Sequence, residues 1–411
     1  MTISSLALAA LLAAPAPPAS APPVAPGPTP APFGSLAELD AAMAAVERGG
    51  DADAFWERVK SAGRMPLVFD DTAVFLHRSR ADRVEWRGDF TGWRHLPEAA
   101  GRRLGESDVW TFRRSFVRAA RLDYKIVEVS DTWIVDPLNP HQQLGGYGPN
   151  SEVRMPDWKP PPHLERKAGV AAGTFGPPEA VPSAKLGYAV NVRIWRPARQ
   201  GTDPLPVLYV TDGSDWWHEQ MGGLTVTLDN LVAEGRLPPL LAVFVDPWDP
   251  DHKANRREAE FLPNRADQSK PIEACPFCEF LVQELSPLVE ARFRVDPKRR
   301  GILGTSLGGF NAAFMGLRYP ERFPLLAIQS PALQRQAWLA AAIARAAVQP
   351  RRVAIDVGGY EERFVPPTRS LRAAYRSRGV PVRYREVPDG HSWGHWRATV
   401  AEMLEFLYGA P

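Results

Sequence analysis

The chain comprises 411 residues, enough for two or three domains of about 150 residues each, and its 45% hydrophobic and 23% charged residues are typical of a globular protein with a sizeable core. Its 49 basic and 47 acidic side chains leave a net charge of +2, which argues against nucleic acid as the main partner. Two cysteines exclude a disulfide scaffold, and no apolar run reaches the roughly 20 residues that cross a bilayer.

The first 34 residues contain nine prolines and no Lys, Arg, Asp or Glu. An apolar stretch over residues 3–14 has the length of the hydrophobic region of a secretory signal, and small residues follow at two candidate cleavage sites. We expect export to the periplasm or out of the cell, with residues 22–34 as a Pro-rich linker. The alternative is an Ala/Pro-rich leader on a cytoplasmic protein, because no basic residue precedes the apolar stretch.

Residues 35–155 change from one periodicity to another. Apolar positions in 35–64 repeat with helical spacing, whereas short β-forming runs separated by turn residues follow from 65 onward. These runs span residues 74–77, 84–87, 110–116 and 124–127. The spacing predicts a helical segment at 35–64, a small antiparallel β-sandwich at 65–155 and a Pro-rich linker at 156–180.

Residues 181–411 alternate between apolar strand-like runs and helical segments. Strands are expected at 188–194, 207–211, 241–245, 300–303, 325–329, 353–357 and 382–387. Helices are expected at 222–235, 273–293, 308–318, 334–346, 366–379 and 394–408. This alternation predicts a doubly wound α/β fold, in which helices cover both faces of a mostly parallel sheet.

The segment Gly304-Thr-Ser306-Leu-Gly308 joins an expected strand to an expected helix. A serine on such a sharp turn takes a strained backbone conformation, and flanking glycines let the strand and the helix pass closely. The turn exposes the hydroxyl at a helix N-terminus, where the backbone N–H of Leu307 can face a developing oxyanion. Ser306 is therefore the candidate nucleophile, and the alternative is a purely structural turn.

A serine nucleophile needs a base, and the base needs an acid that orients it. In such a fold the order along the chain is nucleophile, acid, base, so the base is expected after the last strand. His391 lies there in a glycine-containing loop, whereas its competitor His395 would fall in the first turn of the final helix. For the acid we favour Glu361, which follows a Gly-Gly turn, while Glu362 and Asp356 stay open as alternatives.

A second oxyanion donor is expected on the loop after an earlier strand. Residues 212–217 form such a loop, directly after the strand expected at 207–211. A backbone N–H between Gly213 and Asp215 is the candidate, and we take Ser214 to represent it.

Short motifs over residues 180–410 carry a family resemblance. They are DGSDWW (212–217), LPPLLAVFVD (237–246), RREAEF (256–261), FLVQELSP (280–287), GTSLGG (304–309), YPERF (319–323), QS (329–330) and DGHSW (389–393). In this order they resemble the esterase-D type of α/β-hydrolase, and enterochelin (catecholate siderophore) esterases in particular. The resemblance implies ester hydrolysis through a serine acyl-enzyme without a metal or organic cofactor. It maps the triad onto Ser306, Glu361 and His391.

The front half carries a second resemblance. Residues 83–93, then Trp110-Thr-Phe, Tyr124-Lys-Ile-Val and residues 133–140, are similar to the immunoglobulin-like module of starch-branching and glycogen-binding proteins. The resemblance implies an immunoglobulin-like sandwich ahead of the hydrolase. Its indoles could stack on sugars or on a flat ligand, but strand spacing favours packing in the core: Trp86, Trp93, Trp110 and Trp133.

Four indoles flank the expected oxyanion loop and base: Trp216, Trp217, Trp393 and Trp396. They would suit an aromatic acyl group such as a catechol or a ferulate, and the alternative is ordinary packing of the loops. Arg256 and Arg257 stand in a loop expected beside the site. A guanidinium there could bind a carboxylate or an anionic catecholate, or could pair with Glu258 or Glu260.

Cys275-Pro-Phe-Cys278 has the spacing of a redox motif, but no small βαβ domain surrounds it. A local disulfide is expected if the chain is exported, and a redox-catalytic role is not expected.

These observations predict a serine carboxylic-ester hydrolase that acts on an aromatic-acyl or siderophore-type ester. The expected partner is a small-molecule or oligosaccharide ester, with no nucleic acid, metal or cofactor. Three alternatives stay open: a feruloyl or acetyl polysaccharide esterase, an acyltransferase like the mycolyltransferases, and a non-catalytic carbohydrate-binding protein.

Overall fold

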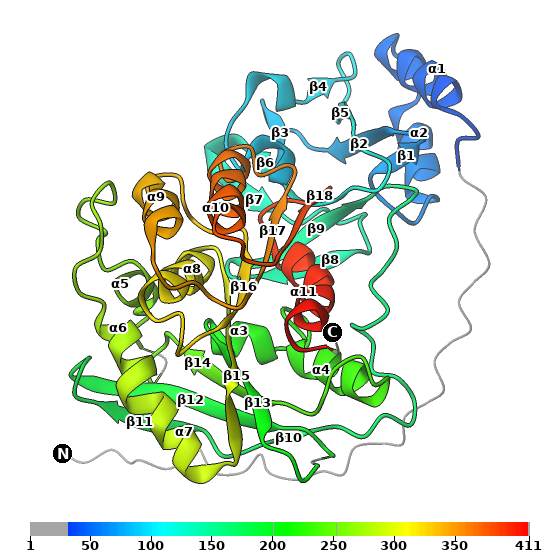
Figure 1. The fold of residues 1–411 in the computed structure, drawn as a ribbon. Coiled ribbons are helices and arrows are strands. Elements are labelled where there is room, and N and C mark those ends of the chain that lie inside the picture. Colours follow the sequence, from blue (N-terminus) through cyan, green and yellow to red (C-terminus); the bar gives the residue numbers. More distant parts are fainter. Residues whose placement is uncertain (1–31, 200, 252, 410–411) are drawn as a thin grey trace, which may run out of the picture.

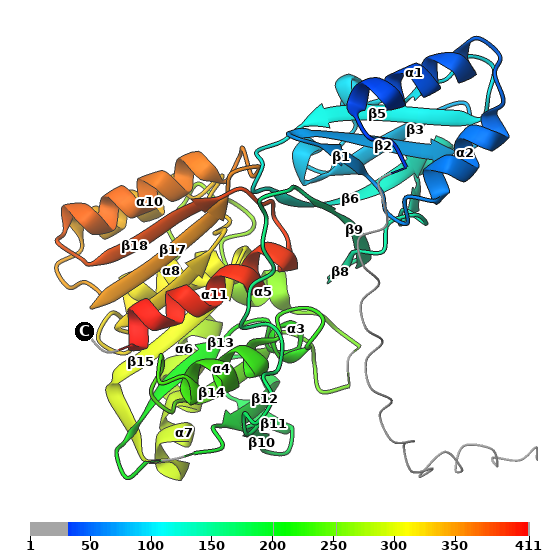
Figure 2. The ribbon, with the colours of Figure 1, turned by 90° about the vertical axis from the view of Figure 1, so that its right-hand side faces the viewer.

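The computed structural model describes residues 32–199, 201–251 and 253–409 (Figure 1). These residues form an N-terminal β-rich unit and a larger α/β unit, which lie side by side (Figure 2). The leader expected at 1–34, with its cleavage sites, lies almost wholly outside the described residues. Within the described part of the chain, no helix combines the length and the apolar character needed to span a bilayer.

Two antiparallel sheets make up the N-terminal unit. The first has the order β1-β2-β5-β4, with bounds Leu67–Phe69, Thr72–Arg78, Val109–Ser115 and Arg102–Arg103. The second has the order β3-β6-β9-β8, with bounds Val84–Gly88, Arg121–Glu128, Gly148–Arg154 and Gln142–Gly145, and β7 (Thr132–Ile134) pairs with β6. Short 3-10 turns lie at Asp89–Thr91, Pro97–Ala99 and Val129–Asp131.

Aromatic side chains fill the space between the two sheets. The rings of Phe75 on β2 and Tyr124 on β6 meet edge to face with their centroids 5.0 Å apart. Trp86 and Trp110 are buried in the same core, as their strand spacing favoured. Two further indoles lie outside this core and stack on each other, with centroids 6.3 Å apart: Trp93 and Trp133.

The segment 35–64 forms two helices, α1 (Leu36–Glu47) and α2 (Ala52–Lys60), on the outer face of the first sheet. Because side chains alternate along a strand, Phe75 faces the other sheet while Val74 and Leu76 face the helices. Strand β2 is therefore buried on both sides, and the helical segment packs as part of the N-terminal unit.

A nine-stranded, mostly parallel sheet is the frame of the α/β unit in the described part of the chain. Its order is β10-β12-β14-β13-β15-β16-β17-β18, and β11 pairs with β12. The bounds of β10 to β14 are Thr174–Phe175, Glu179–Ser183, Tyr188–Arg196, Leu205–Val210 and Leu241–Asp246. The bounds of β15 to β18 are Val295–Thr305, Leu325–Gln329, Arg352–Gly358 and Val382–Val387.

The pairs from β14 through β18 are parallel, and β10, β11 and β14 are antiparallel to β12. The prediction of an α/β fold with a mostly parallel sheet is confirmed, and each expected strand is present. The end of the segment expected as a linker differs, because β10 and the start of β11 join this sheet.

Helices cover both faces of the sheet. One face packs against α3 (Gly213–Trp217), α4 (Leu224–Ala233) and α11 (Trp393–Tyr408). The other face packs against a helical run made of α6 (Pro276–Glu279), a π-helical turn (Phe280–Leu285) and α7 (Ser286–Arg292), and against four more helices. These are α5 (Arg257–Phe261), α8 (Leu307–Arg318), α9 (Ala337–Arg345) and α10 (Val365–Ser377).

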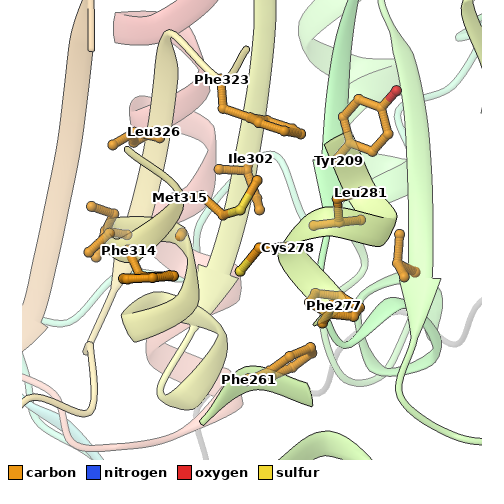
Figure 3. Close-up of a cluster of buried hydrophobic side chains, with 14 of the residues drawn as sticks. Tyr209, Phe261, Phe277, Cys278, Leu281, Ile302, Phe314, Met315, Phe323 and Leu326 are labelled. Atoms are coloured by element: carbon orange, nitrogen blue, oxygen red, sulfur yellow. The ribbon is translucent and has the colours of Figure 1, made fainter. Parts of the chain in front are cut away.

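Figure 3 shows the apolar cluster between α8 and the run that begins with α6. Phe314 and Met315 on α8 point toward Phe277, Cys278 and Leu281 on the facing helix. This cluster fixes α8, whose first residue follows Ser306, against a second layer of helix.

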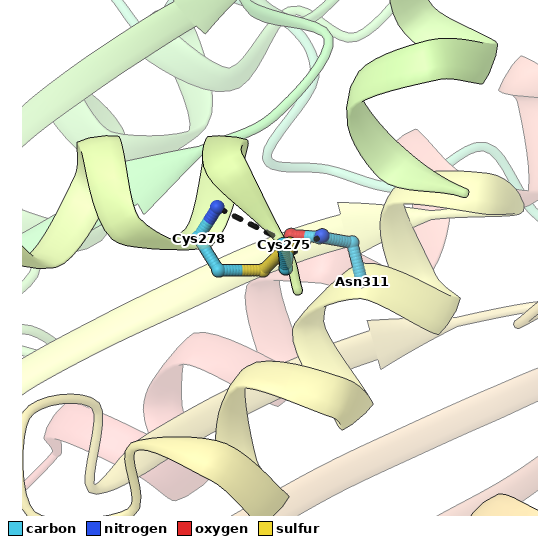
Figure 4. The surroundings of a disulfide bond; sticks show 3 residues. All are labelled: Cys275, Cys278 and Asn311. Atoms are coloured by element: carbon cyan, nitrogen blue, oxygen red, sulfur yellow. Dashed lines mark hydrogen bonds between the residues drawn. A yellow bond between two sulfur atoms is a disulfide. The ribbon is translucent and has the colours of Figure 1, made fainter. Parts of the chain in front are cut away.

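Cys275 and Cys278 form a disulfide at the start of α6 (Figure 4). The Sγ of Cys275 accepts a hydrogen bond from the backbone N–H of Cys278, and the Nδ2 of Asn311 lies 3.6 Å from the other sulfur. Because Asn311 belongs to α8, the disulfide packs against the helix that follows the candidate nucleophile.

Candidate active site

Ser306 occupies the turn between β15 and α8, where the glycine-flanked motif predicted a nucleophile. Its φ of 56° and ψ of −115° are strained for a residue with a side chain. Two backbone hydrogen bonds hold the turn: the N–H of Ser306 donates to Gln329 O over 2.9 Å, and the N–H of Ala332 donates to Ser306 O over 2.9 Å. The hydroxyl is thereby fixed, half-exposed, at the carboxyl edge of the sheet.

Gly304 and Gly308 of the motif have no room for a side chain. A Cβ on Gly304 would lie 2.0 Å from the carbonyl oxygen of Gly308, and a Cβ on Gly308 would lie 2.5 Å from Oγ1 of Thr211. Neither contact is possible between non-bonded atoms, so larger residues would push α8 away from β15 and β13 and displace the serine.

His391 lies in the loop between β18 and α11, called here the base loop (residues 388–392). Its Nε2 lies 2.9 Å from the Oγ of Ser306, and its Nδ1 lies 2.6 Å from Oε2 of Glu361. The ring packs between Phe364, with centroids 4.4 Å apart, and the edge of Trp396, with centroids 5.0 Å apart. With Nδ1–H donating to Glu361, the other nitrogen is free to accept the serine proton.

Glu361 lies in the turn after β17 and is held by several donors. Its Oε1 accepts from the backbone N–H of Gly358 over 2.7 Å and from the hydroxyl of Ser330 over 2.6 Å. Burial alone would raise the pKa of Glu361, but His391 and then His395 hold that pKa well below its usual range. The carboxylate therefore stays ionised and keeps its hydrogen bond to Nδ1.

The alternatives to Glu361 and His391 lie elsewhere. Glu362 is exposed on the outer side of the turn. Asp356 is buried in β17, where its Oδ1 lies 3.4 Å from Nε2 of His395 and its Oδ2 accepts from Gln329. His395 falls in the first turn of α11, as expected, and is fully buried behind the base.

His395 is a second histidine beside the active site, and it is fully buried. Burial would lower the pKa of His395, but Asp356, and after it Glu361, raise that pKa well above its ordinary value. The Nδ1 of His395 also lies 3.1 Å from Gly390 O, inside the base loop. A buried imidazolium thus lies directly behind the hydrogen-bonded serine, histidine and glutamate.

The two predicted oxyanion donors follow neighbouring strands of the sheet, β15 and β13. Leu307 begins α8, and the first backbone N–H groups of a helix have no partner within it. Ser214 lies in the first turn of α3, directly after β13, which neighbours β15 in the sheet. Its hydroxyl donates to Oδ1 of Asp246 over 3.0 Å, so its backbone N–H remains the candidate donor.

The expectation that the indoles line the substrate site is wrong for Trp216 and Trp393. Trp216 has no exposed surface and Trp393 is buried, and the two rings pack edge to face with centroids 5.3 Å apart. Trp217 is half-buried against Phe175 and Phe244. These rings pack the loops onto the sheet because α3 and α11 lie on the same face of it, and a pattern of tryptophans does not distinguish that role from ligand contact.

Arg256 and Arg257 both lie at the rim, in different roles. Arg256 stacks its guanidinium over Tyr188 at 4.0 Å and forms its ion pair with Asp249, 3.9 Å away, while its charge also acts on Glu260. The side chain of Arg256 is 28% exposed and can reach a ligand. Arg257 instead braces the site, as its Nε and Nη2 donate to Asp212 over 2.6 and 2.9 Å and Nη2 also donates to Thr305 O over 3.2 Å.

The sequence analysis did not identify two residues that influence the site, Ser330 and Tyr147. Ser330 directly follows β16, the strand beside β15, so its position at the carboxyl edge was the available signal. Tyr147 stands 99% exposed at the turn between β8 and β9. Burial would lower the pKa of Arg257, but Asp212 and, more weakly, Asp215 and the Tyr147 phenol raise it, so the tyrosine of the N-terminal unit lies near the site.

The comparisons with known proteins agree with this geometry. The iron(III) enterobactin esterase of Escherichia coli strain K12 is 26% identical over 295 residues, 67% of each chain. That of Dickeya dadantii is 29% identical over 212 residues, 48% of this chain and 43% of the relative. The enterobactin esterase of Shigella flexneri, solved in the presence of enterobactin, has a TM-score of 0.66 at 22% identity and covers 82% of this chain and 92% of its own, which shows a shared fold.

The sequence profile of the putative esterase family matches residues 183–407, which is more than half of the chain and includes the serine, the glutamate and the histidine described above. The chain belongs to the putative esterase family, and it is an enterochelin-esterase-like α/β-hydrolase that hydrolyses carboxylic esters.

Proposed function

We propose that the protein hydrolyses siderophore-type catecholate esters through an acyl-enzyme on Ser306. The observation that carries this proposal is the hydrogen-bonded series from Ser306 Oγ to His391 Nε2 (2.9 Å) and from His391 Nδ1 to Glu361 (2.6 Å). A serine, an imidazole and a carboxylate at these distances are arranged for nucleophilic catalysis.

The proton path follows from the same distances. As Ser306 attacks the ester carbonyl, His391 Nε2 takes the hydroxyl proton, and Glu361 stabilises the imidazolium that forms. The oxyanion meets the N–H of Leu307 and, in this proposal, an N–H near Ser214. His391 then gives its proton to the leaving alcohol, and it activates the water that hydrolyses the acyl-enzyme.

Charge at the rim favours an anionic substrate. The guanidinium of Arg256 is partly exposed over Tyr188, and the exposed phenol of Tyr147 lies near Arg257. Burial raises the pKa of Asp215 and of Glu260 to about 7, which reduces the negative charge beside Arg257 and Arg256. A catecholate offers both the negative charge and the flat ring that such a rim can bind. The relatives described above are esterases of enterobactin, which belongs to this class.

The test is hydrolysis of an enterobactin-type trilactone, iron-free and ferric, beside a neutral aryl acetate. Wild-type protein should cleave the trilactones with the higher kcat/KM, and Ser306→Ala should lower kcat by about 10⁴- to 10⁶-fold on every substrate. Phosphonate labelling should stop in the same variant. Activity that survives Ser306→Ala would overturn the mechanism.

The rim has a separate test. Arg256→Ala should raise KM for the anionic trilactone by about tenfold, the effect expected for loss of one charge-assisted contact, while KM for the neutral aryl acetate stays unchanged. Arg318→Ala is the matched control, because Arg318 is exposed at the far end of α8, about 18 Å along the helix from Ser306. An equal effect of Arg256→Ala on both substrates would remove Arg256 from the rim proposal.

We also propose that the N-terminal unit is an immunoglobulin-like sandwich and that the chain is exported. Two face-to-face antiparallel sheets support the first proposal. The signal-like pattern at residues 3–14 and the disulfide between Cys275 and Cys278 support the second, because disulfides persist in oxidising compartments. Cell fractionation of the full-length chain, with mass spectrometry of its mature N-terminus, tests the export proposal.

A further inference from the structure

The N-terminal unit packs directly against the base loop. The backbone N–H of Arg121, the first residue of β6, donates to Pro388 O over 3.1 Å. A Cβ on Gly390 would lie 2.0 Å from Cγ of Asp89, and a Cβ on Gly394 would lie 2.0 Å from Cζ of Arg121. Side chains of the sandwich therefore occupy the space that larger residues at these two glycines would need.

The guanidinium of Arg121 connects the two units. Within the sandwich, its Nε and Nη2 donate to Glu152 over 3.0 and 2.7 Å, and Nη2 also donates to Asp123. Across the interface, Nη1 donates to the hydroxyl of Ser392 over 3.0 Å and lies 3.4 Å from Oδ1 of Asp389. The side chain is 2% exposed, so water does not compete for these bonds.

Asp389 and Ser392 lie on either side of His391. Asp389 Oδ1 also accepts from the N–H of Gly390 over 2.8 Å, which fixes the turn before His391. The Oγ of Ser392 accepts from the N–H of His395 over 3.3 Å and so caps α11 after it. A single buried guanidinium thus holds the residues on both sides of the catalytic imidazole.

A second contact reaches the acid. The backbone N–H of Val117 donates to the hydroxyl of Tyr360 over 3.2 Å, and Phe116 packs on the Tyr360 ring with centroids 6.1 Å apart. Tyr360 is the residue before Glu361. The sandwich therefore contacts both turns whose side chains must stay within hydrogen-bond distance of each other.

The buried carboxylates around Arg121 depend on its positive charge. Burial, followed by the charge of Asp123, raises the pKa of Asp89 to about 7, and burial raises that of Asp389 to about 6. Burial would raise the pKa of Glu152 too, but Arg121 and then Arg154 lower it. Loss of the guanidinium would leave several buried carboxylates without their cation, directly behind the base loop.

We propose that Arg121 is a positioning residue of the esterase and that the N-terminal sandwich holds the catalytic histidine in place, rather than acting as a separate carbohydrate-binding module. This inference rests on the proposed role of His391. The Arg121, Asp123 and Glu152 end of the second sheet is buried against the base loop, so that end of the sheet is closed to a glycan. A displaced imidazole slows proton transfer but leaves the rim that binds substrate unchanged.

The test compares Arg121→Met and Arg121→Lys with Arg118→Met in the full-length chain. Arg118 is the matched control because it is an exposed arginine of the same unit that pairs with Asp157 and Asp70 and does not contact the base loop. Active sites are counted by phosphonate titration, so kcat is expressed per competent site. Arg121→Met should lower this kcat by about 10²-fold, the effect expected for a small misplacement of a catalytic group, with KM nearly unchanged.

Two further readouts separate positioning from folding. Arg121→Lys keeps the positive charge but loses the several N–H donors of the guanidinium, so its kcat should lie between those of Arg121→Met and wild type. The pH at half-maximal kcat/KM should differ between wild type and Arg121→Met. A variant that merely loses folded protein would show fewer titratable sites with normal kcat and a normal pH profile, and this result would overturn the proposal. If Arg121→Met yields no folded protein, normal kcat per site in Arg121→Lys overturns it. Failure of the esterase proposal itself would be seen separately, as wild-type activity that does not depend on Ser306.

Discussion

Two buried groups of charges meet at the base loop, and they differ in balance. The first contains the carboxylates and imidazoles of the active site: Glu361, Asp356, His391 and His395. The second contains an arginine and the carboxylates near it: Arg121, Asp89, Asp123, Glu152 and Asp389. The first group matches acids with bases, whereas in the second, among the described residues, carboxylates outnumber the guanidinium groups that they contact. The carboxylates of the two groups therefore have opposite pKa shifts: the pKa of Glu361 is lowered, whereas those of Asp89 and Asp389 are raised.

The signs follow from the pKa shifts. The lowered pKa of Glu361 stabilises the fold above its unfolded value of 4.5, and this stability is lost as the pH falls through the folded pKa. The raised pKa of His395 stabilises the fold below 6.5, and that stability is lost as the pH rises through the folded value. On the sandwich side, the pKa of Asp89 is raised from 3.8 to about 7, so stability falls as the pH rises across that interval.

Glu361→Gln should have the largest effect, because it removes the acceptor that fixes the tautomer of His391. We expect kcat to fall by about 10⁴-fold, as for loss of the acid in other serine triads. The matched control is Glu362→Gln, since Glu362 is the exposed neighbour in the same turn, and its kcat should equal that of wild type. Steady-state hydrolysis of an aryl acetate measures both. Equal activity of the two variants would show that the acid lies elsewhere.

Much of the fold was predictable because its signals are local. The strands of the α/β unit are short, fully apolar runs, and those around Ile302, Ile328 and Ile355 are buried on both faces as that pattern predicts. The positions of Ser306 and His391 could be predicted from the fold, because the carboxyl ends of parallel strands meet at one edge of the sheet. The Gly-Gly turn before Glu361 favoured this residue as the triad acid. Only the structure excludes Asp356 from that role, because its side chain faces His395.

The rest depended on contacts between distant residues. Trp216 and Trp393 are far apart in sequence, and they are core residues because they pack against each other. The local sequence around either residue does not indicate this packing. Arg121 lies on a strand whose alternation predicts only an outward-facing position, and the sequence does not say that the base loop covers that face. Interfaces between units join residues hundreds of positions apart, so composition and periodicity do not report them.

Asp356→Asn tests the active-site side without touching the triad. The substitution removes the carboxylate charge beside the buried imidazolium of His395. Breaking a buried ion pair costs about 3–5 kcal/mol of unfolding free energy. Urea unfolding at pH 5.5 and 8 measures this cost and the loss of the pH dependence that His395 supplies. Glu386→Gln is the control, because Glu386 pairs with Arg369 at the surface, where such a pair is worth about 1 kcal/mol or less. Equal costs for the two variants would contradict a charged His395.

Asp89→Asn tests the sandwich side, where the raised pKa of Asp89 makes stability fall as the pH rises. Wild-type stability should fall from pH 5 to pH 8 through this group, and the variant should narrow that difference by about 2–3 kcal/mol, since two pKa units of the shift lie in this range. Urea titrations at the two pH values measure the narrowing. Asp71→Asn, at an exposed aspartate of the same unit, should leave the difference unchanged. A wider difference in Asp89→Asn would mean that the Asp89 carboxylate is stabilised rather than strained.

The smallest effects come from two hydroxyls, that of Ser330, which contacts Glu361, and that of Ser392, which contacts Arg121. Ser330 donates to Glu361 over 2.6 Å and accepts from Trp396 over 3.1 Å, while Ser392 accepts from Arg121 over 3.0 Å. The hydroxyl of Ser330 bonds the Glu361 carboxylate, and that of Ser392 bonds Arg121 and also donates to Asp389 over 3.4 Å. Ser330→Ala and Ser392→Ala should therefore each cost about 1.5–3 kcal/mol of unfolding free energy. Ser370→Ala, which removes an exposed hydroxyl on α10, is the control for both.

The kinetics of this serine pair decide whether the two sides of the loop are equivalent in catalysis. If the loop must be held from both sides, each variant lowers kcat per titrated site, by up to about tenfold for 1.4 kcal/mol at the transition state. A loss of kcat confined to Ser330→Ala would mean that the sandwich supports the fold and contributes nothing to the position of His391. Because Ser330 contacts the acid and Ser392 contacts Arg121, a difference in kcat between the two variants shows which of these contacts holds His391 in place.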